Sequence, residues 1–237
     1  MLKQALVAVL SVMLAVLLIP RDWSAPARLL SRQELSLYDG EGGSRGLYLA
    51  ILGQVFDVSK GHQHYGPGGA YHFMAGRDAS LAFITGHFTQ DLTDDVSSLS
   101  PLQVVALFDW LSFYQRHYTP VGMLIGRFYH ETGQPTDTLL NVEKMLAEGR
   151  HLKAQSDAER VRFPPCNSEW TGRGGRVWCS PKSGGVIREW TGVPRRLFSP
   201  ASSVQCVCVK DAAEQDPSLQ EYDGCPADAD SCAVGEH

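Results

Sequence analysis

Tyrosine and histidine side chains crowd a glycine-rich turn between residues 60 and 80 of this 237-residue chain. The turn reads Gly66-Pro67-Gly68-Gly69, and Tyr65 and Tyr71 stand on either side of it. Glycine adopts positive φ without a Cβ penalty and proline fixes its own φ, so this segment can bend sharply and let a flat ligand approach its backbone. Phenol and imidazole groups are ligands of haem iron. The stretch therefore predicts a haem crevice in which the last two glycines of the turn face the ring.

Short regular elements must hold this turn in place. Residues 47–52 and 55–59 are strand-favouring apolar runs, and Gly53-Gln54 is suited to the turn between them. After the turn, Asp78 stands where an N-cap would start a short helix through Thr85. We expect strand, turn, strand, glycine loop and helix to form one unit with a cleft at its middle.

Two capping boxes predict further helices. Ser31 precedes Glu34 at the right spacing for a short helix, and Ser100 precedes Gln103 with a proline at the first helical position. A strand over residues 119–129 is expected to close the sheet. The second helix should bury one stripe against the sheet and bring Tyr118 to the cleft. That stripe comprises Leu102, Val105, Ala106, Trp110, Phe113 and Tyr114.

Three segments in this region resemble the membrane-associated progesterone receptor branch of the cytochrome b5 superfamily. They are Val55–Gly61, Tyr65–Tyr71 and Ala75–Ser80, and the similarity runs from about residue 33 to residue 122. The resemblance implies an α+β fold: a small mixed sheet with short helices around a haem cleft. It implies a haem-binding protein and not an enzyme, since no nucleophile–base pair, phosphate loop or metal triad emerges.

The resemblance also assigns roles within the cleft. It places the axial ligand at Tyr71 and gives Tyr65 a supporting hydrogen bond to that ligand. His117 and Tyr118 match a Lys-Tyr pair that contacts the haem edge, and the histidine would make a propionate contact pH-dependent.

Ordinary cytochrome b5 holds its haem between two histidines, and this chain departs from that pattern. Gly66 stands where the first histidine would be, while His87 has the spacing of the second and is the alternative or second ligand. A tyrosine has an unperturbed pKa of about 10, so it must lose its proton to the charge of the metal. The phenolate is a hard anionic donor that favours ferric iron. We therefore expect ferric haem b, a low potential, and carriage or sensing of haem in preference to fast electron transfer.

The N-terminal segment is apolar and short. Residues 5–19 follow Lys3, and as a helix they would span about 22 Å against a hydrocarbon core of about 30 Å. This predicts a signal peptide over residues 1–24, with an uncleaved membrane anchor as the alternative. A net charge of −5 without a basic cluster gives no reason to expect nucleic acid binding.

The cysteines support an oxidising compartment. All six lie in the last third of the chain, where an even count predicts three disulfides with 15 possible pairings. A zinc site is the alternative, but no Cys-x-x-Cys spacing occurs. The six are Cys166, Cys179, Cys206, Cys208, Cys225 and Cys232.

These features predict four parts: the leader, a haem-binding domain over 29–130, a helical linker over 131–162, and a Cys-rich region with a loosely ordered acidic tail over 163–237. The resemblance implies a secreted protein that signals to cells, including neurons, through a cell-surface receptor, or that carries haem. A redox or steroid-sensing protein of the secretory pathway is the alternative, and a haem-free binding module is a third. An exposed haem face would also allow a haem-dependent homodimer.

Overall fold

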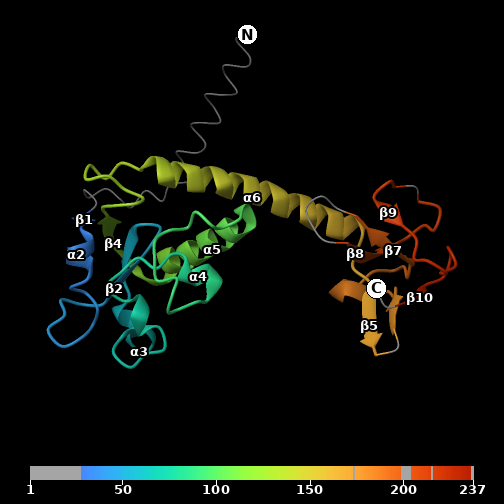
Figure 1. Ribbon diagram of the computed structural model, residues 1–237, viewed down its shortest axis with the longest axis horizontal. Coiled ribbons are helices and arrows are strands. Elements are labelled where there is room, and N and C mark those ends of the chain that lie inside the picture. The colour runs from blue at the N-terminus through green and yellow to red at the C-terminus, as the bar shows by residue number, and fades with distance from the viewer. Residues whose placement is uncertain (1–27, 173, 199–203, 215, 236–237) are drawn as a thin grey trace, which may run out of the picture. The chain divides into compact units, whose positions relative to one another are not determined.

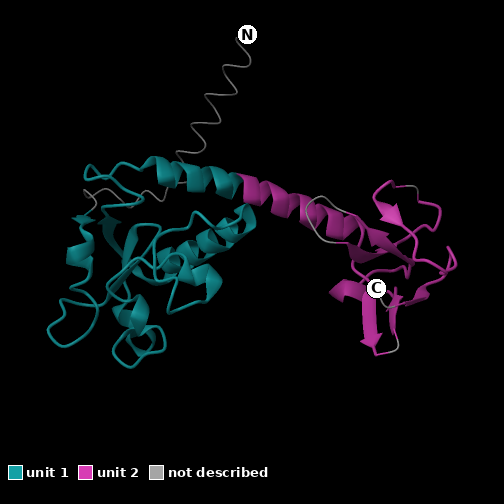
Figure 2. Ribbon diagram, viewed as in Figure 1, with its two compact units in different colours: residues 1–147 teal, residues 148–237 magenta. Residues whose placement is uncertain are grey.

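The computed structural model describes residues 28–172, 174–198, 204–214 and 216–235 (Figure 1). The chain divides into two compact units, residues 1–147 and 148–237 (Figure 2). The expected leader over residues 1–24 lies outside the described residues. Within the described ranges, no helix combines the length and the apolar character that crossing a membrane requires.

A four-stranded mixed sheet organises the first unit. Its strands are β1 (Arg28–Leu30), β2 (Tyr48–Ile51), β3 (Gln54–Asp57) and β4 (Thr119–Leu124). Their order is β1-β4-β3-β2, with β1 parallel to β4 and the other neighbours antiparallel. The helices are α2 (Arg32–Leu35), α3 (His62–Tyr65), α4 (Ala82–Thr85) and α5 (Pro101–His117), with 3-10 turns at Ser59–Gly61 (η1) and His72–Met74 (η2). The expected α+β architecture is confirmed.

Both predicted capping boxes are present. The Ser31 hydroxyl accepts from the Glu34 amide at 3.1 Å, and the Glu34 carboxylate accepts from the Ser31 amide at 2.7 Å. Ser100 and Gln103 make the same reciprocal pair at the start of α5, with proline at the first helical position. These caps satisfy amides that a helix start otherwise leaves without partners.

The turn between β2 and β3 lies one residue earlier than predicted. Leu52 and Gly53 both have positive φ, +49° and +73°, which is the conformation of a two-residue hairpin turn. Positive φ is strained for a leucine. A hydrogen bond stabilises this conformation, because the Leu52 amide donates to the Ser80 hydroxyl at 2.8 Å.

Asp78 holds the same hairpin turn, and its predicted role as a helix cap is wrong. Its carboxylate accepts the Gly53 amide at 2.7 Å and both the amide and the hydroxyl of Ser80. Helix α4 starts later, with Leu81 at its N-cap and no side-chain cap. Burial raises the pKa of Asp78, and the hydrogen bonds from Ser80 and Gly53 act against that rise.

Helix α5 buries only part of the predicted stripe, namely Val105 and Tyr114. Its buried side chains are Val104, Val105, Leu107, Leu111 and Tyr114, whereas Leu102 and Trp110 are 47% and 43% exposed. The aromatic and aliphatic residues of this helix occur on more than one face, so the periodicity alone could not decide which face meets the sheet.

The closing strand is shorter than predicted, because β4 ends at Leu124. The chain then reverses through Gly126, whose φ of +149° favours glycine and whose amide bonds the Tyr129 carbonyl at 2.9 Å. Helix α6 spans Asp137–Arg162, within the segment predicted to be helical. Its first half places Leu139, Val142 and Leu146 in the core of the first unit.

The second unit contains two three-stranded sheets. One has the order β10-β6-β5 and the other β8-β7-β9. The strands are β5 (Asn167–Thr171), β6 (Gly174–Trp178), β7 (Val193–Leu197), β8 (Gln205–Val209), β9 (Leu219–Gln220) and β10 (Ser231–Val234). A small core lies under the second sheet, with Phe163, Val193, Leu197, Val207 and Val209 buried.

All six cysteines are paired, which selects one pattern from the 15 that the sequence allows. The pairs are Cys166–Cys206, Cys179–Cys208 and Cys225–Cys232. Three sulfurs, those of Cys166, Cys179 and Cys208, lie within 4.8 Å of one another, but they belong to two disulfides and are not free thiolates. The disulfide prediction is therefore confirmed over the zinc alternative.

The described part of the acidic C-terminal segment, residues 211–214 and 216–235, is held by specific contacts, contrary to the predicted loose order. Strand β10 pairs with β6, and the Cys225–Cys232 disulfide joins β10 to the loop that precedes it. The buried guanidinium of Arg195 donates to the carbonyls of Ala212 at 3.4 Å and Ala227 at 2.7 Å. These bonds tie the segment to β7, because a buried arginine must find acceptors.

Candidate functional site

Backbone contacts shape the glycine turn. Among its glycines only Gly68 takes positive φ, at +81°. A Cβ on Gly69 would lie 2.3 Å from the carbonyl oxygen of His64, and one on Gly66 would lie 2.6 Å from the ring of His62. Two of the three glycines are therefore needed because the loop folds back against α3. The Tyr71 amide completes this closure by donating to the His64 carbonyl at 2.9 Å.

Tyr65 lies at the end of α3 with its side chain buried. It is 7% exposed, and its hydroxyl lies 2.5 Å from the hydroxyl of Tyr114 on α5. Burial raises the pKa of Tyr65 to about 12. A phenol with so high a pKa stays protonated, so Tyr65 can act as a hydrogen-bond donor or acceptor but not as a free phenolate at neutral pH.

Tyr71 is the exposed tyrosine of the loop. It is 42% exposed and contacts the rings of Tyr65, Phe73 and Phe88, with centroid distances of 6.3, 6.3 and 6.1 Å. Phe73 and Phe88 also contact each other at 4.8 Å. The structure therefore brings the two predicted tyrosines together and surrounds the outer one with apolar rings.

His117 and Tyr118 end α5 on the same side of the unit as Tyr65. Tyr118 is half-buried, and its ring lies 6.0 Å from that of Tyr65. His117 is exposed and stacks on Phe113 at 4.3 Å, while its Nδ1 lies 2.8 Å from the Phe113 carbonyl. The predicted edge pair thus divides into a half-buried tyrosine beside Tyr65 and an exposed histidine.

His87 and His72 each have side-chain partners. The side chain of His87 is 72% exposed and pairs with Asp91 at 3.3 Å. His72 uses both ring nitrogens, one 2.8 Å from the Tyr65 carbonyl and one 2.9 Å from Glu41. The bond to the Tyr65 backbone, followed by that to Glu41, raises the pKa of His72. The neighbour of His87, Phe88, is the residue that contacts Tyr71.

Sequence reasoning missed three aromatic residues of the site. The sequence pattern places Tyr114 only in a helix stripe and gives Phe73 and Phe88 no role. Phe73 is two residues from Tyr71, and Phe88 directly follows His87. Their aromatic character beside candidate ligands is a signal, but only the fold shows that they meet.

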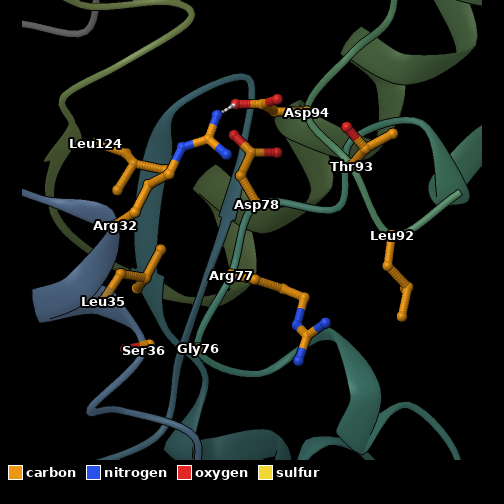
Figure 3. Close-up of a pocket in the computed structure, with 10 residues that line it drawn as sticks. All are labelled: Arg32, Leu35, Ser36, Gly76, Arg77, Asp78, Leu92, Thr93, Asp94 and Leu124. Atoms are coloured by element: carbon orange, nitrogen blue, oxygen red, sulfur yellow. Dashed lines mark hydrogen bonds and ion pairs between the residues drawn. The ribbon is translucent and has the colours of Figure 1, made fainter.

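A separate pocket of about 290 Å³ lies between α2 and the segments around residues 76–78 and 92–94 (Figure 3). Arg32 and Arg127 both bind the buried carboxylate of Asp94 there, the latter at 3.0 Å. Figure 3 shows the Arg32 guanidinium directed at Asp94, whereas Arg77 extends away from this pair. None of the tyrosines described above lines this pocket, so it is not the predicted haem cleft. Its ion pairs anchor α2 to the loop that follows α4.

The sheet, the short helices and the loop with its two tyrosines define a cytochrome b5-like domain. Residues 31–149 match the family described as "Cytochrome b5-like Heme/Steroid binding domain". A solved Arabidopsis thaliana protein titled as having a cytochrome b5 like fold is 30% identical over 46% of this chain and 100% of its own, with a TM-score of 0.40. A putative steroid-binding protein from Arabidopsis is 33% identical over 42% of this chain and 99% of its own, with a TM-score of 0.39.

The similarity to several proteins extends beyond that domain into the Cys-rich unit. Neuferricin of Danio rerio is 58% identical over 90% of this chain and 82% of its own length. Neuferricin of Homo sapiens is 46% identical over 87% of this chain and 86% of its own. The chain therefore belongs to the neuferricin family, and its b5-like domain supports haem binding.

Proposed function

We propose that this chain binds ferric haem with the Tyr71 phenolate as axial ligand. The observation that carries the proposal is an exposed phenol, 42% accessible, surrounded by the rings of Tyr65, Phe73 and Phe88. Apolar rings suit the porphyrin face, and the phenol oxygen is a donor for its iron. Haem, when bound, supplies a redox-active ferric iron.

The chain's own residues would bind and orient that group. Tyr65 stays protonated and can donate a hydrogen bond to an anionic ligand, which favours the phenolate form of Tyr71. In this proposal Tyr118, which lies beside Tyr65, and His117, at the end of α5, contact the haem edge. A phenolate stabilises ferric over ferrous iron, so the potential should be low and the function binding, carriage or sensing of haem and not catalysis.

The first test is an ultraviolet–visible titration of the chain with ferric haem, for the wild type and His87→Ala. We expect saturable uptake with a high-spin ferric tyrosinate spectrum in both, because His87 pairs with Asp91 and no contact joins it to the described tyrosines. A low-spin spectrum that is stable on reduction and is lost in His87→Ala would contradict the proposal. That outcome would favour the alternative, a redox protein of the secretory pathway.

We further propose that the protein works outside the cell, as a haem carrier or as a signalling factor for a cell-surface receptor, including one on neurons. Three disulfides support an oxidising compartment, because thiols stay reduced in the cytosol. Because Tyr71 is exposed, haem bound to it would also have an exposed face. The proposal therefore includes a haem-dependent homodimer.

Expression of the full chain in cultured cells tests the location. We expect the protein in the medium, with its N-terminus near residue 25 by terminal sequencing and its cysteines resistant to alkylation. A chain retained in membrane pellets with Met1 intact would show that the N-terminal segment is an anchor. Fully alkylated cysteines would contradict an oxidising compartment altogether.

A further inference from the structure

Tyr114 is buried directly behind the proposed haem site. It lies on α5, is 1% exposed, and its hydroxyl is 2.5 Å from that of Tyr65, 49 residues earlier in the chain. The ring of Tyr114 lies 6.2 Å from that of Tyr65, which in turn lies 6.3 Å from that of Tyr71. Three tyrosines thus form a row that leads from the core to the exposed phenol.

Packing alone does not explain a hydroxyl at position 114. The rings of Phe56, Phe83 and Phe113 surround Tyr114 at 5.8, 5.6 and 5.6 Å. A phenylalanine would fill this space and would avoid the cost of burying a hydroxyl group. The hydrogen-bond partner of the Tyr114 hydroxyl is another buried phenol, that of Tyr65. The ring of Tyr65 in turn contacts the proposed ligand, Tyr71.

A phenol donates one hydrogen bond and can accept two. If Tyr114 donates to Tyr65, the Tyr65 oxygen is satisfied as an acceptor and its own proton is available for another partner. Two more tyrosine rings lie beside Tyr65, that of Tyr118 at 6.0 Å and that of Tyr71 at 6.3 Å. Of these two, Tyr71 would be an anion when it binds iron and would then be the stronger acceptor. Hydrogen bonds in such a chain strengthen one another, because each donor polarises the next group.

We propose that Tyr114 is a positioning residue for the haem ligand, which orients the Tyr65 hydroxyl and strengthens its hydrogen bond to the Tyr71 phenolate. This inference rests on the proposed function, in which Tyr71 binds the iron. Without Tyr114 the Tyr65 hydroxyl would be free to rotate, and the phenolate would keep more electron density. A more electron-rich phenolate favours ferric iron further, so the midpoint potential should become more negative.

The test uses the haem-loaded full chain as wild type, Tyr114→Phe, Tyr65→Phe and the double variant. Tyr129→Phe is the matched control, because Tyr129 is also buried, 8% exposed, but packs against the turn at Gly53. We expect Tyr114→Phe to shift the ferric/ferrous midpoint to a more negative potential, because the phenolate then keeps more electron density. In the Tyr65→Phe background the same substitution should leave the potential unchanged, and Tyr129→Phe should leave it at the wild-type value.

A structural role alone would give a different result. It would lower the melting temperature of Tyr114→Phe without moving the potential, or would move the potential equally in both backgrounds, and either result overturns the inference. The haem-free chain gives a second measurement, a downfield hydroxyl proton resonance that should disappear in both Tyr65→Phe and Tyr114→Phe. If that resonance persists in either variant, the hydrogen bond is not the one inferred.

These measurements separate the two proposals. A wild-type chain that takes up no haem refutes the proposed function, and this inference falls with it. A chain that binds haem through Tyr71 but shows a wild-type potential in Tyr114→Phe refutes only the role of Tyr114.

Discussion

Tyr71→Phe is expected to abolish the tyrosinate spectrum of the haem-loaded chain and to weaken ferric haem binding by more than about 100-fold. Loss of residues that only support a ligand already costs about 10- to 100-fold in metal affinity, so loss of the ligand atom should cost more. The phenylalanine keeps the ring contacts with Tyr65, Phe73 and Phe88 and removes only the phenol oxygen.

The fold should survive this substitution. Tyr71 is 42% exposed, and among the described residues its hydroxyl makes no hydrogen bond, so the free energy of unfolding should change by less than about 0.5 kcal/mol. Its amide bond to the His64 carbonyl involves only the backbone and remains. Thermal unfolding of the haem-free chain checks this point.

Tyr222→Phe serves as the matched control for the titration. Tyr222 is a half-buried tyrosine of the second unit, so the same atom is removed far along the chain from the proposed site. We expect wild-type haem binding in this variant. A tyrosinate spectrum that persists in Tyr71→Phe would show that another tyrosine binds the iron, and the assignment of Tyr71 would be wrong.

The second large effect is expected in the Cys-rich unit. Replacing both Cys179 and Cys208 by alanine should lower the free energy of unfolding of this unit by about 3.5 kcal/mol, the chain-entropy value for a loop of this length. The two cysteines are 29 residues apart and 3% and 0% exposed, so their disulfide links the sheet of β6 to the sheet of β8 from within the core. Alanine avoids the buried hydroxyl that serine would introduce.

Urea unfolding followed by tryptophan fluorescence measures this effect, because Trp170, Trp178 and Trp190 belong to the second unit. The control is the double alanine variant of Cys225 and Cys232, whose separation of 7 residues predicts a smaller loss of about 2 kcal/mol. Equal urea midpoints for the two variants would show that the buried disulfide stabilises the unit no more than the Cys225–Cys232 disulfide does. Haem binding by the first unit should be unchanged in both.

Local interactions could be predicted from the sequence because their partners are close along the chain. The capping boxes at Ser31 and Ser100 join residues three apart, and the helix from Asp137 to Arg162 follows from its own apolar periodicity. The even number of cysteines in the last third predicts disulfides without any geometry, since the argument needs only composition. Tyr65 and Tyr71 likewise stand on either side of one short glycine turn, so their closeness, 6.3 Å between ring centroids, follows from residues six apart in the chain.

Contacts between distant residues could not be found in this way. Asp78 has the local appearance of a helix cap, yet its carboxylate accepts the Gly53 amide 25 residues earlier. The pairing of the cysteines depends on which strands of β6, β7 and β8 lie side by side, and the sequence permits all 15 patterns. The predicted buried face of α5 was only partly right, because the apolar residues of this helix cover more than one side.

The sequence by itself determined the class of this protein, the tyrosines that could bind its cofactor, and the presence of disulfides. The tertiary structure alone decided which groups support those tyrosines, because Tyr65 and Tyr114 are 49 residues apart and meet only when α5 packs across the sheet. A hydrogen bond depends on position to within tenths of an ångström, whereas a sequence pattern specifies only neighbours along the chain. The phenol pair behind Tyr71 is therefore a product of the fold.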